Sequence, residues 1–267
     1  MNKAEQALRE LKEMDALAAG QSPIHGLCPL SKLLTTVLYI VFVLSFGKYA
    51  FTRLVPMALY PVLLFQLSGV PLGTCFYKLR FVLPLVLAVG LFNPLLDREA
   101  LLTLGGVTVS GGLISMLTLM LKGTLCLTAS FFLMATTRID ALCAALRKLR
   151  VPGLLVTLLL LTYRYVGVMT EEVAIMTDAY HLRAPGQRGI QFRAWGSFLG
   201  QLLLRSLDRA EELYASMLLR GFHDRFYYAD AGSFTVRDGI YLVCSAAAFL
   251  LLRFVDVTRL LGGLIVG

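Results

Sequence analysis

The chain has 267 residues, of which 57% are hydrophobic and 16% charged, and its mean hydropathy is +0.73. A soluble domain of this length has about 25% charged residues and shorter apolar runs. We therefore exclude a soluble enzyme with one packed core and expect a membrane protein with several spans. The formal net charge of +8 indicates either membrane orientation or a basic surface for nucleic acid, and the position of the charges decides between them.

Residues 1–20 are too rich in charge for a signal peptide. Apolar residues recur there at helical spacing, with charged residues opposite them, and Gly20 ends the pattern. The segment predicts a short amphipathic helix that lies along the membrane surface or against a partner. A frayed, solvated N-terminus is the alternative.

Four apolar segments follow, each close to the roughly 20 residues that a helix needs to cross a bilayer core. They cover about residues 33–46, 54–70, 81–96 and 113–136, and a fifth covers about residues 240–255. Prolines inside the second and third segments predict kinks, because neighbouring helices can bind the freed carbonyls. The cysteines form no CxxC pair, so we interpret them as small buried hydrophobes: Cys28, Cys75, Cys126, Cys143 and Cys244.

Positive charge is concentrated between the fourth and fifth segments. Thirteen of the 25 Lys and Arg residues lie between Arg138 and Arg237. The positive-inside rule places this block in the cytoplasm. Alternation of five spans then predicts a cytoplasmic N-terminus and an external C-terminus. The excess charge is explained by orientation, and it gives no support for nucleic acid as a partner.

The basic block predicts three helices, at about residues 138–149, 152–183 and 192–220. The second begins with an apolar stretch that is only about half a membrane thick before Arg164, so it should dip into the interface or pack under the spans. In the third helix we expect a charged exposed face and a buried apolar face formed by Trp195, Phe198, Leu199, Leu202, Leu203, Leu207, Ala210, Leu213, Tyr214 and Met217.

The two long helices end alike, each with an arginine between small or apolar neighbours. The two triplets are Leu182-Arg183-Ala184 and Leu219-Arg220-Gly221. An arginine at this position can bind the last carbonyls of its own helix, which is a purely structural role. Its repetition at two consecutive helix ends favours a further role, in which two rigid helices dock guanidinium groups into acidic grooves on a partner.

Several motifs together are similar to those of one transporter family. In chain order they are Cys28-Pro29-Leu30-Ser31-Lys32-Leu33, Asn93-Pro94-Leu95-Leu96-Asp97, Ser110-Gly111-Gly112, Leu149-Arg150-Val151-Pro152, Tyr163-Arg164-Tyr165, Glu171-Glu172, Leu204-Arg205-Ser206-Leu207-Asp208-Arg209-Ala210 and Met217-Leu218-Leu219-Arg220-Gly221-Phe222. The pattern resembles the transmembrane T component of energy-coupling-factor (ECF) transporters, in the CbiQ-like branch associated with cobalt uptake. The resemblance covers nearly the whole chain after about residue 22.

The resemblance implies a non-catalytic membrane scaffold. In that family two Ala-Arg-Gly-type motifs engage a pair of ATP-binding-cassette (ABC) ATPases, and the membrane face holds a substrate-binding S component, here a metal-binding, CbiM-like one. By position the coupling residues would be Leu182, Arg183, Ala184, Leu219, Arg220 and Gly221. Both triplets keep the arginine but depart from Ala-Arg-Gly. The resemblance also implies a plasma or inner cell membrane location and a link to cobalamin biosynthesis.

The sequence offers no catalytic or cofactor motif of its own. There is no GxxxxGK[ST] motif, so ATP would be bound by the partner ATPases. The glycine-rich residues 105–112 predict an external turn. The three histidines, His25, His181 and His223, lie far apart and predict no metal site. Asp208 and Glu212 lie at helical spacing from Arg205 and Arg209, and Glu171 and Glu172 lie on the preceding predicted helix. We interpret these acids as a solvated, ion-paired face.

Lys122 lies near the middle of the fourth span, where insertion of a charged side chain costs about 2.5–3.5 kcal/mol. An ion path would need several such groups, and a cation is a poor ligand for a metal cation. A packing or snorkelling role is therefore favoured. A contact between Lys122 and the S component remains the alternative.

We expect an all-α membrane protein with about five transmembrane helices and a cytoplasmic coupling domain of three helices inserted before the last span. The expected segments are an amphipathic N-terminus at 1–32, a four-span domain at 33–137, coupling helices at 138–237, and a last span with its tail at 238–267. A nickel or vitamin transporter stays open, because the substrate site belongs to another chain. A self-contained channel or secondary transporter, or a membrane-bound enzyme, is less well supported by the polar residues present.

Overall fold

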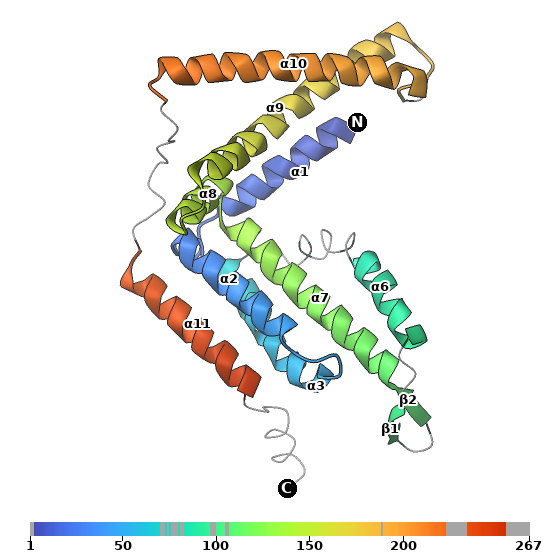
Figure 1. Ribbon diagram of the computed structural model, residues 1–267, viewed down its shortest axis with the longest axis vertical. Coiled ribbons are helices and arrows are strands. Elements are labelled where there is room, and N and C mark those ends of the chain that lie inside the picture. The colour runs from blue at the N-terminus through green and yellow to red at the C-terminus, as the bar shows by residue number, and fades with distance from the viewer. Residues whose placement is uncertain are drawn as a thin grey trace. The chain divides into compact units, whose positions relative to one another are not determined.

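The computed structural model describes residues 3–69, 73, 75, 80, 83–96, 100–104, 107–187, 189–222 and 234–254 (Figure 1). These residues are mostly helical, with one antiparallel hairpin formed by β1 (Ala100–Leu104) and β2 (Val107–Ser110). The chain divides into two compact units. We call residues 17–138 with 232–267 the apolar unit, and residues 1–16 with 139–231 the basic unit.

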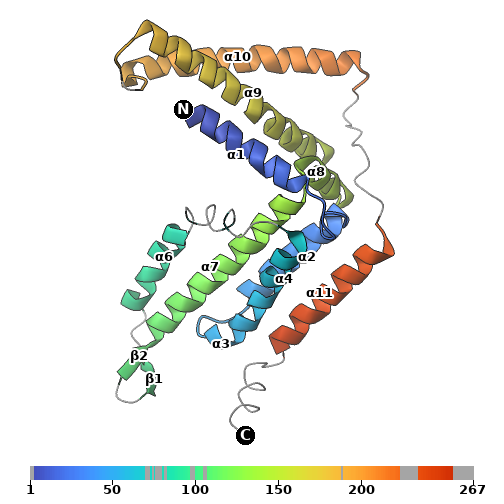
Figure 2. The same cartoon turned by 180° about the vertical axis from the view of Figure 1, so that it is seen from behind.

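The apolar unit is a group of packed helices. Its elements are α2 (Pro29–Leu44), α3 (Phe51–Leu54), the 3-10 helix η1 (Val55–Ala58), α4 (Leu59–Ser68), α6 (Leu83–Leu96), α7 (Gly111–Thr136) and α11 (Val236–Phe254). The long helix α7 packs against α2, α3 and α6, and α11 packs along α2 (Figures 1 and 2). The kink predicted at Pro56 is present as the 3-10 turn η1, which interrupts the α-helical path of residues 51–68.

Three helical stretches among the described residues are long and apolar enough to cross a membrane. They are Phe51–Ser68, Gly111–Thr136 and Gly153–Arg183, and α2 is apolar but shorter. The first two coincide with predicted spans. The third was expected to dip into the interface or to pack under the spans, and it qualifies here by its length and composition alone. The predicted fifth span forms α11, whose two ends carry Arg237, Asp238 and Arg253.

The core of the apolar unit is aromatic. Tyr39 and Phe249 are fully or almost fully buried, and their ring centroids lie 5.3 Å apart. The ring centroid of Tyr60 lies 4.6 Å from that of Tyr39 and 5.0 Å from that of Phe249, which it contacts edge-on. The Tyr39 hydroxyl donates to the Met57 carbonyl at 3.0 Å, so its polar end is satisfied. These contacts join α2, α4 and α11.

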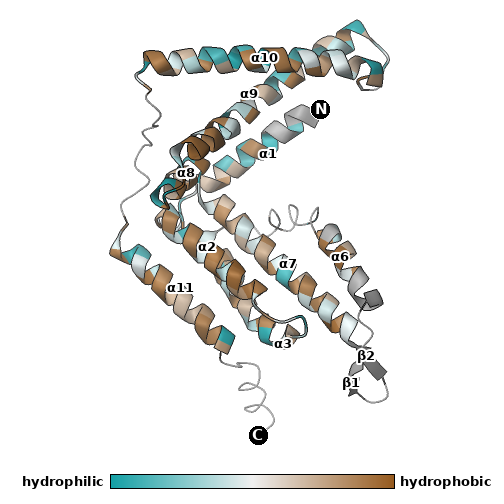
Figure 3. Cartoon of the chain, in the orientation of Figure 1, coloured by the Kyte–Doolittle hydropathy of each residue, from teal (hydrophilic) through white to brown (hydrophobic). Residues whose placement is uncertain are grey.

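The outer faces of these helices are apolar as well. Val37 and Val41 on α2 are 50% and 60% exposed, and Leu117 and Met134 on α7 are 46% and 56% exposed. Figure 3 shows hydrophobic residues on both the inner and the outer sides of this unit. Apolar side chains exposed on this scale are stable only when lipid or another protein covers them, which agrees with a membrane location.

Small residues bring α6 and α7 close together. A Cβ atom at Gly123 would lie 2.8 Å from Val86 Cγ1, and one at Gly90 would lie 3.3 Å from Met116 Cγ. Close approach through glycine is a common way for helices to associate in membranes, where van der Waals packing replaces the hydrophobic effect. Helix α6 therefore depends on the absence of side chains at these positions.

A buried carboxylate joins the N-terminal ends of α2 and α11. Asp238 is 4% exposed, and its Oδ1 accepts the backbone N–H of Cys28 at 2.7 Å, just before α2. Its Oδ2 accepts the N–H of Thr235 at 2.9 Å, just before α11. Beside it, buried Lys32 donates to the carbonyl of Thr136 at 2.8 Å, in the last turn of α7. The negative charge of Asp238 thus lies at the N-terminal ends of α2 and α11, and the positive charge of Lys32 lies at the C-terminal end of α7.

The basic unit contains α1 (Lys3–Ala18), α8 (Ile139–Lys148), α9 (Gly153–Arg183) and α10 (Phe192–Leu219). The four predicted helices of this region are confirmed, each to within a few residues. Helix α9 packs against α8 and α10. The Tyr163 hydroxyl donates to Asp15 Oδ1 at 2.6 Å, which links α1 to α9.

The turn between α8 and α9 holds a non-glycine residue in the left-handed region. Arg150 has φ 63°, donates its N–H to Arg147 O, and is followed by Val151, whose N–H reaches Leu146 O. These are the two hydrogen bonds of a Schellman helix end, at a position where glycine is usual. The left-handed conformation costs a non-glycine residue about 1–2 kcal/mol. Pro152 follows and opens α9.

Two expectations about side-chain burial are wrong. No residue of α10 is buried, and Trp195, Leu203 and Tyr214 of its predicted core face are 43%, 60% and 58% exposed. A single contact with α9 cannot cover an apolar face that runs along 28 residues. Among the cysteines, Cys244 is exposed and Cys126 partly so, whereas Cys28, Cys75 and Cys143 are buried as expected. Burial raises the pKa of the Cys143 thiol, and Asp140 raises it further.

The glycine-rich segment also differs from its prediction. Gly111 and Gly112 begin α7 instead of forming a turn, and Gly105 and Gly106 lie outside the described residues. The strands β1 and β2 flank them, in a region where the sequence pattern indicated only a loop.

Gly123→Ala should destabilise the protein, because the new methyl group would overlap the stiff Val86 side chain. Overpacking of this kind costs about 1–3 kcal/mol. The matched control is Gly167→Ala in α9, where a Cβ atom meets nothing within 4 Å and helix propensity favours alanine by about 1 kcal/mol. In thermal unfolding of the detergent-solubilised chain, the first variant should lower the midpoint and the second should raise it. Equal shifts would contradict the packing argument.

Asp238→Asn should lower the free energy of unfolding by about 1–3 kcal/mol. The Cys28 and Thr235 N–H groups bind different oxygens of Asp238, and asparagine would replace one of these oxygens with an NH2 group that cannot accept. The amide also lacks the charge that both helix N-termini favour. Asp208→Asn is the control, because Asp208 is exposed on α10 and the change should stay within about 0.5 kcal/mol. Denaturant unfolding of the two variants measures the difference, and equal stabilities would refute the role of Asp238.

Candidate functional site

The first arginine triplet forms the end of α9. Arg183 is the last helical residue, and the N–H of Ala184 closes the helix on Tyr180 O at 3.0 Å. The helix cannot continue because Pro185 follows, and Gly186 turns the chain with φ 92°. Arg183 is exposed, and Leu182 beside it is 84% exposed. The end of α9 therefore presents a cation and an apolar side chain together.

The second triplet forms the end of α10 in a complete Schellman motif. Phe222 N–H binds Met217 O at 3.0 Å, and Gly221 N–H binds Leu218 O at 3.0 Å. Gly221 has φ 78°, which is why glycine suits this position. The backbone thus satisfies its own carbonyls. Arg220 is exposed at the C-cap, and Leu219 is 90% exposed.

The two arginine ends belong to different helices and are separated by the length of α10. Figure 1 shows α9 ending near the start of α10, while Arg220 closes the other end of α10. At 1.5 Å per residue, α10 is about 42 Å long. Neither arginine has an ion-pair partner among the residues that the structure describes. Guanidinium groups bind carboxylates through paired hydrogen bonds, so each end is suited to an acidic, partly apolar groove.

The acidic residues of α9 and α10 form ion pairs. Arg205 pairs with Glu172 across the two helices, and Arg209 pairs with Glu212 within α10 at 3.3 Å. Glu171 and Asp208 are exposed. Ion pairing is confirmed for Glu172 and Glu212, but only Glu212 is solvent-exposed, because Glu172 is half-buried. The exposed pair of Arg209 and Glu212 contributes little to stability.

The described residues contain no group of three or more His, Cys, Asp or Glu side chains that could hold a metal ion. The ring nitrogens of His25 lie 2.7 Å from Ser22 Oγ and 3.0 Å from Leu17 O, so hydrogen bonds hold this ring. His181 is exposed in the last turn of α9, and His223 lies outside the described residues.

Lys122 contacts the C-terminal end of α2. Its Nζ donates to Phe46 O at 2.5 Å and lies 3.4 Å from Leu44 O. Arg253 of α11 reaches the same helix end, where it donates to Ser45 O at 3.2 Å and lies over the Phe46 ring at 4.4 Å. The two cations bind carbonyls that α2 itself leaves unpaired, and they face the negative end of its dipole. This geometry supports the packing role of Lys122.

The profile of the CbiQ family, described as cobalt transport protein, matches residues 20–228. The chain belongs to the CbiQ family. The match includes α9, α10 and both arginine triplets, and most of α1 precedes it. CbiQ proteins are components of membrane transporters, and the apolar helices of this CbiQ chain agree with that assignment.

Curated relatives of the CbiQ chain are named for two metals. It is 30% identical over 135 residues to the nickel permease LarQ of Lactiplantibacillus plantarum, a match covering 51% of this chain and 49% of the relative. It is 37% identical over 91 residues to the cobalt transport protein CbiQ of Rhodobacter capsulatus, covering 34% and 37%. An uncharacterised protein of Methanocaldococcus jannaschii is 25% identical over 147 residues, covering 54% and 50%. The chain spans about half the length of these relatives, or less.

Sequence reasoning missed three polar residues that organise the CbiQ chain. Lys32 was quoted only within a family motif, Arg253 was given no role, and Asp238 lay at a predicted boundary. Each is a charged residue at the end of an apolar helix, and such residues are expected to bind a neighbouring helix end. That signal identifies the residues as candidates, but the partner helix depends on tertiary packing.

Lys122→Met should lower the stability of the CbiQ chain by about 1–3 kcal/mol, because Phe46 O would lose its charged donor. Lys122→Arg keeps the positive charge and should restore most of the loss. Thermal unfolding in detergent measures both variants. A stable Lys122→Met protein whose transport is abolished in a fully assembled complex would show instead that Lys122 contacts a partner.

Proposed function

We propose that this chain is the T component of an ECF-type ABC importer for cobalt ions. In this proposal it is the non-catalytic scaffold that joins two ABC-type ATPase subunits to a metal-binding membrane S component. The carrying observation is that α9 and α10 each end in an exposed Leu–Arg pair. Membership of the CbiQ family, together with the resemblance of the sequence motifs to ECF T components, supports the same reading.

The proposed mechanism is mechanical. Two ATPase subunits that approach on ATP binding would each hold one arginine end, Arg183 on one subunit and Arg220 on the other. The apolar residues Leu182 and Leu219 would enter the same grooves, and Ala184 and Gly221 leave room beside each arginine. A conformational change is transmitted only by an element that contacts both states differently. A continuous helix about 42 Å long between the two contacts meets this requirement.

The charges of Arg183 and Arg220 are unpaired among the described residues, and they support acidic grooves as the partner surface. The basic unit carries exposed arginines at both contact points, and the described chain offers neither of them a carboxylate. Acidic grooves on the ATPases would form charge-assisted hydrogen bonds with both arginines, and no ion pair within the described chain would have to break. ATP would be bound and hydrolysed by these subunits. The N-terminus and the basic unit would lie on the cytoplasmic side of the cell membrane, where ATP is available.

Nickel is the second candidate substrate, because one relative is named a nickel permease. In the proposed assembly the S component binds the metal and this chain does not. Both metals are therefore compatible with the same coupling site. A vitamin importer would use an equivalent scaffold, but neither named relative points to it.

Arg183→Glu combined with Arg220→Glu should release the ATPase subunits from the complex. Each reversal would place a carboxylate against an acidic groove, so both contacts would become repulsive. Pull-down of the ATPases with the tagged chain, together with metal-dependent ATPase activity, measures the effect. We expect a loss of at least about tenfold in retained ATPase.

The matched control is Arg9→Glu with Lys12→Glu. It changes the net charge equally at two exposed positions of α1 in the basic unit, outside both triplets. This variant should retain the ATPases and their coupled activity. If the double reversal at Arg183 and Arg220 behaved like the control, the coupling role would be rejected.

A further inference from the structure

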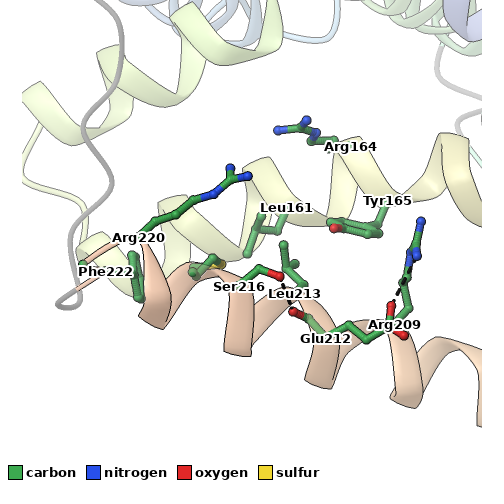
Figure 4. A pocket seen from close by; sticks show the side chains of 11 residues that line it. Leu161, Arg164, Tyr165, Arg209, Glu212, Leu213, Ser216, Arg220 and Phe222 are labelled. Atoms are coloured by element: carbon green, nitrogen blue, oxygen red, sulfur yellow. Dashed lines mark hydrogen bonds and ion pairs between the residues drawn. The ribbon is translucent and has the colours of Figure 1, made fainter.

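A groove of about 490 Å³ lies between α9 and α10 (Figure 4). Its lining includes Leu161, Arg164 and Tyr165 of α9, Arg209 and Leu213 of α10, and Arg220 at the C-cap of α10. Leucine side chains lie between the two helices, and arginines surround them. An apolar floor with a cationic rim suits an amphiphile better than a small soluble ion.

The groove carries an excess of positive charge. It contains three arginines and one carboxylate, Glu212, which is paired with Arg209 at 3.3 Å. Arg164 and Arg220 have no ion-pair partner within the described ranges. Figure 4 shows their guanidinium groups pointing toward one another from opposite helices. Like charges that converge on one space repel, so an anion between them is stabilised by both.

The position of Arg164 relates the groove to the membrane surface. The helix begins with an apolar stretch in which Leu154 and Leu155 are 70% and 57% exposed, and Figure 3 shows this part of α9 as strongly hydrophobic. Arg164 follows the stretch and lies between Tyr163 and Tyr165. Arginine and tyrosine at the end of an exposed apolar run are typical of the boundary between hydrocarbon and water. Lipid headgroups occupy that depth.

We propose that this groove binds the phosphate of an anionic phospholipid of the cytoplasmic leaflet. Arg164 provides a guanidinium fork for the phosphate oxygens, and Arg220 faces it from α10. Leu161 and Leu213 contact the carbons that adjoin the headgroup. Basic pockets between helices on the cytoplasmic side are a known type of site for anionic headgroups.

Arg220 also belongs to the proposed ATPase contact, and the two roles are compatible. A guanidinium group has five N–H donors, so one edge can bind a phosphate while the other binds a carboxylate of a partner. A bound lipid would then hold Arg220 in place for docking. The lipid site itself does not depend on the ATPases, so it can be tested on the chain alone.

The test is binding of phosphatidylglycerol to the full chain in detergent, followed by native mass spectrometry with phosphatidylcholine of the same acyl chains as reference. We expect phosphatidylglycerol to bind more tightly, and Arg164→Gln to weaken it by about tenfold. Arg164→Lys keeps the charge but not the fork, and should recover part of the affinity. Arg193→Gln, an exposed arginine of α10 outside the groove, should bind like the wild type. Circular dichroism verifies that each variant is folded.

Three results would overturn the proposal. Equal affinity for the two lipids, or equal binding by wild type and folded Arg164→Gln, would exclude headgroup recognition at this groove. Displacement of the lipid by an equal concentration of inorganic phosphate would identify a free-anion site. Displacement by added ATPase subunits would identify the groove as a protein-docking surface. The comparisons of lipids and of variants are made without ATPase, so their failure would leave the coupling role of Arg183 and Arg220 untouched.

Discussion

The apolar unit depends on charged side chains that bind the ends of its helices. The Asp238 carboxylate joins the N-terminal ends of α2 and α11, and Lys122 and Arg253 bind carbonyls at the C-terminal end of α2. A helix end surrounded by hydrocarbon has no water to satisfy its backbone, so a contact of this kind is worth more there than at a soluble surface. Helix α2 is therefore held at both ends by its neighbours, and the aromatic core lies between these contacts.

The basic unit uses its charges differently. Between α9 and α10, Glu172 is paired with Arg205, and within α10 Glu212 is paired with Arg209. The helix ends are closed by backbone N–H groups, as in the Schellman turn at Gly221. Arg183 and Arg220 are consequently not needed to close their own helices. This observation weighs against a purely structural role for both arginines, and it leaves their guanidinium groups available to partners.

The exposed apolar faces indicate what the isolated chain lacks. Helix α10 buries none of its side chains, and the first turns of α9 expose several leucines. Exposure of this extent is stable only against lipid or other proteins. In the proposed assembly, the ATPases, the S component and the bilayer would cover these faces. The groove near Arg164 is the point at which a cationic rim and an apolar floor meet, which is the chemistry of a lipid headgroup region.

The sequence by itself determined the helical elements, because apolar periodicity, Pro152, Pro185 and Gly221 mark helix limits through local backbone chemistry. It also determined the family, through motifs that include both arginine triplets, and the resemblance was borne out by the match over residues 20–228. Burial on α10 was predicted wrongly, because amphipathic spacing shows which face is apolar but not whether a partner within the chain covers it. The contacts of Lys122, Asp238 and Arg253 were decided only by tertiary structure, since each joins helices far apart in sequence and depends on which helix ends packing brings together.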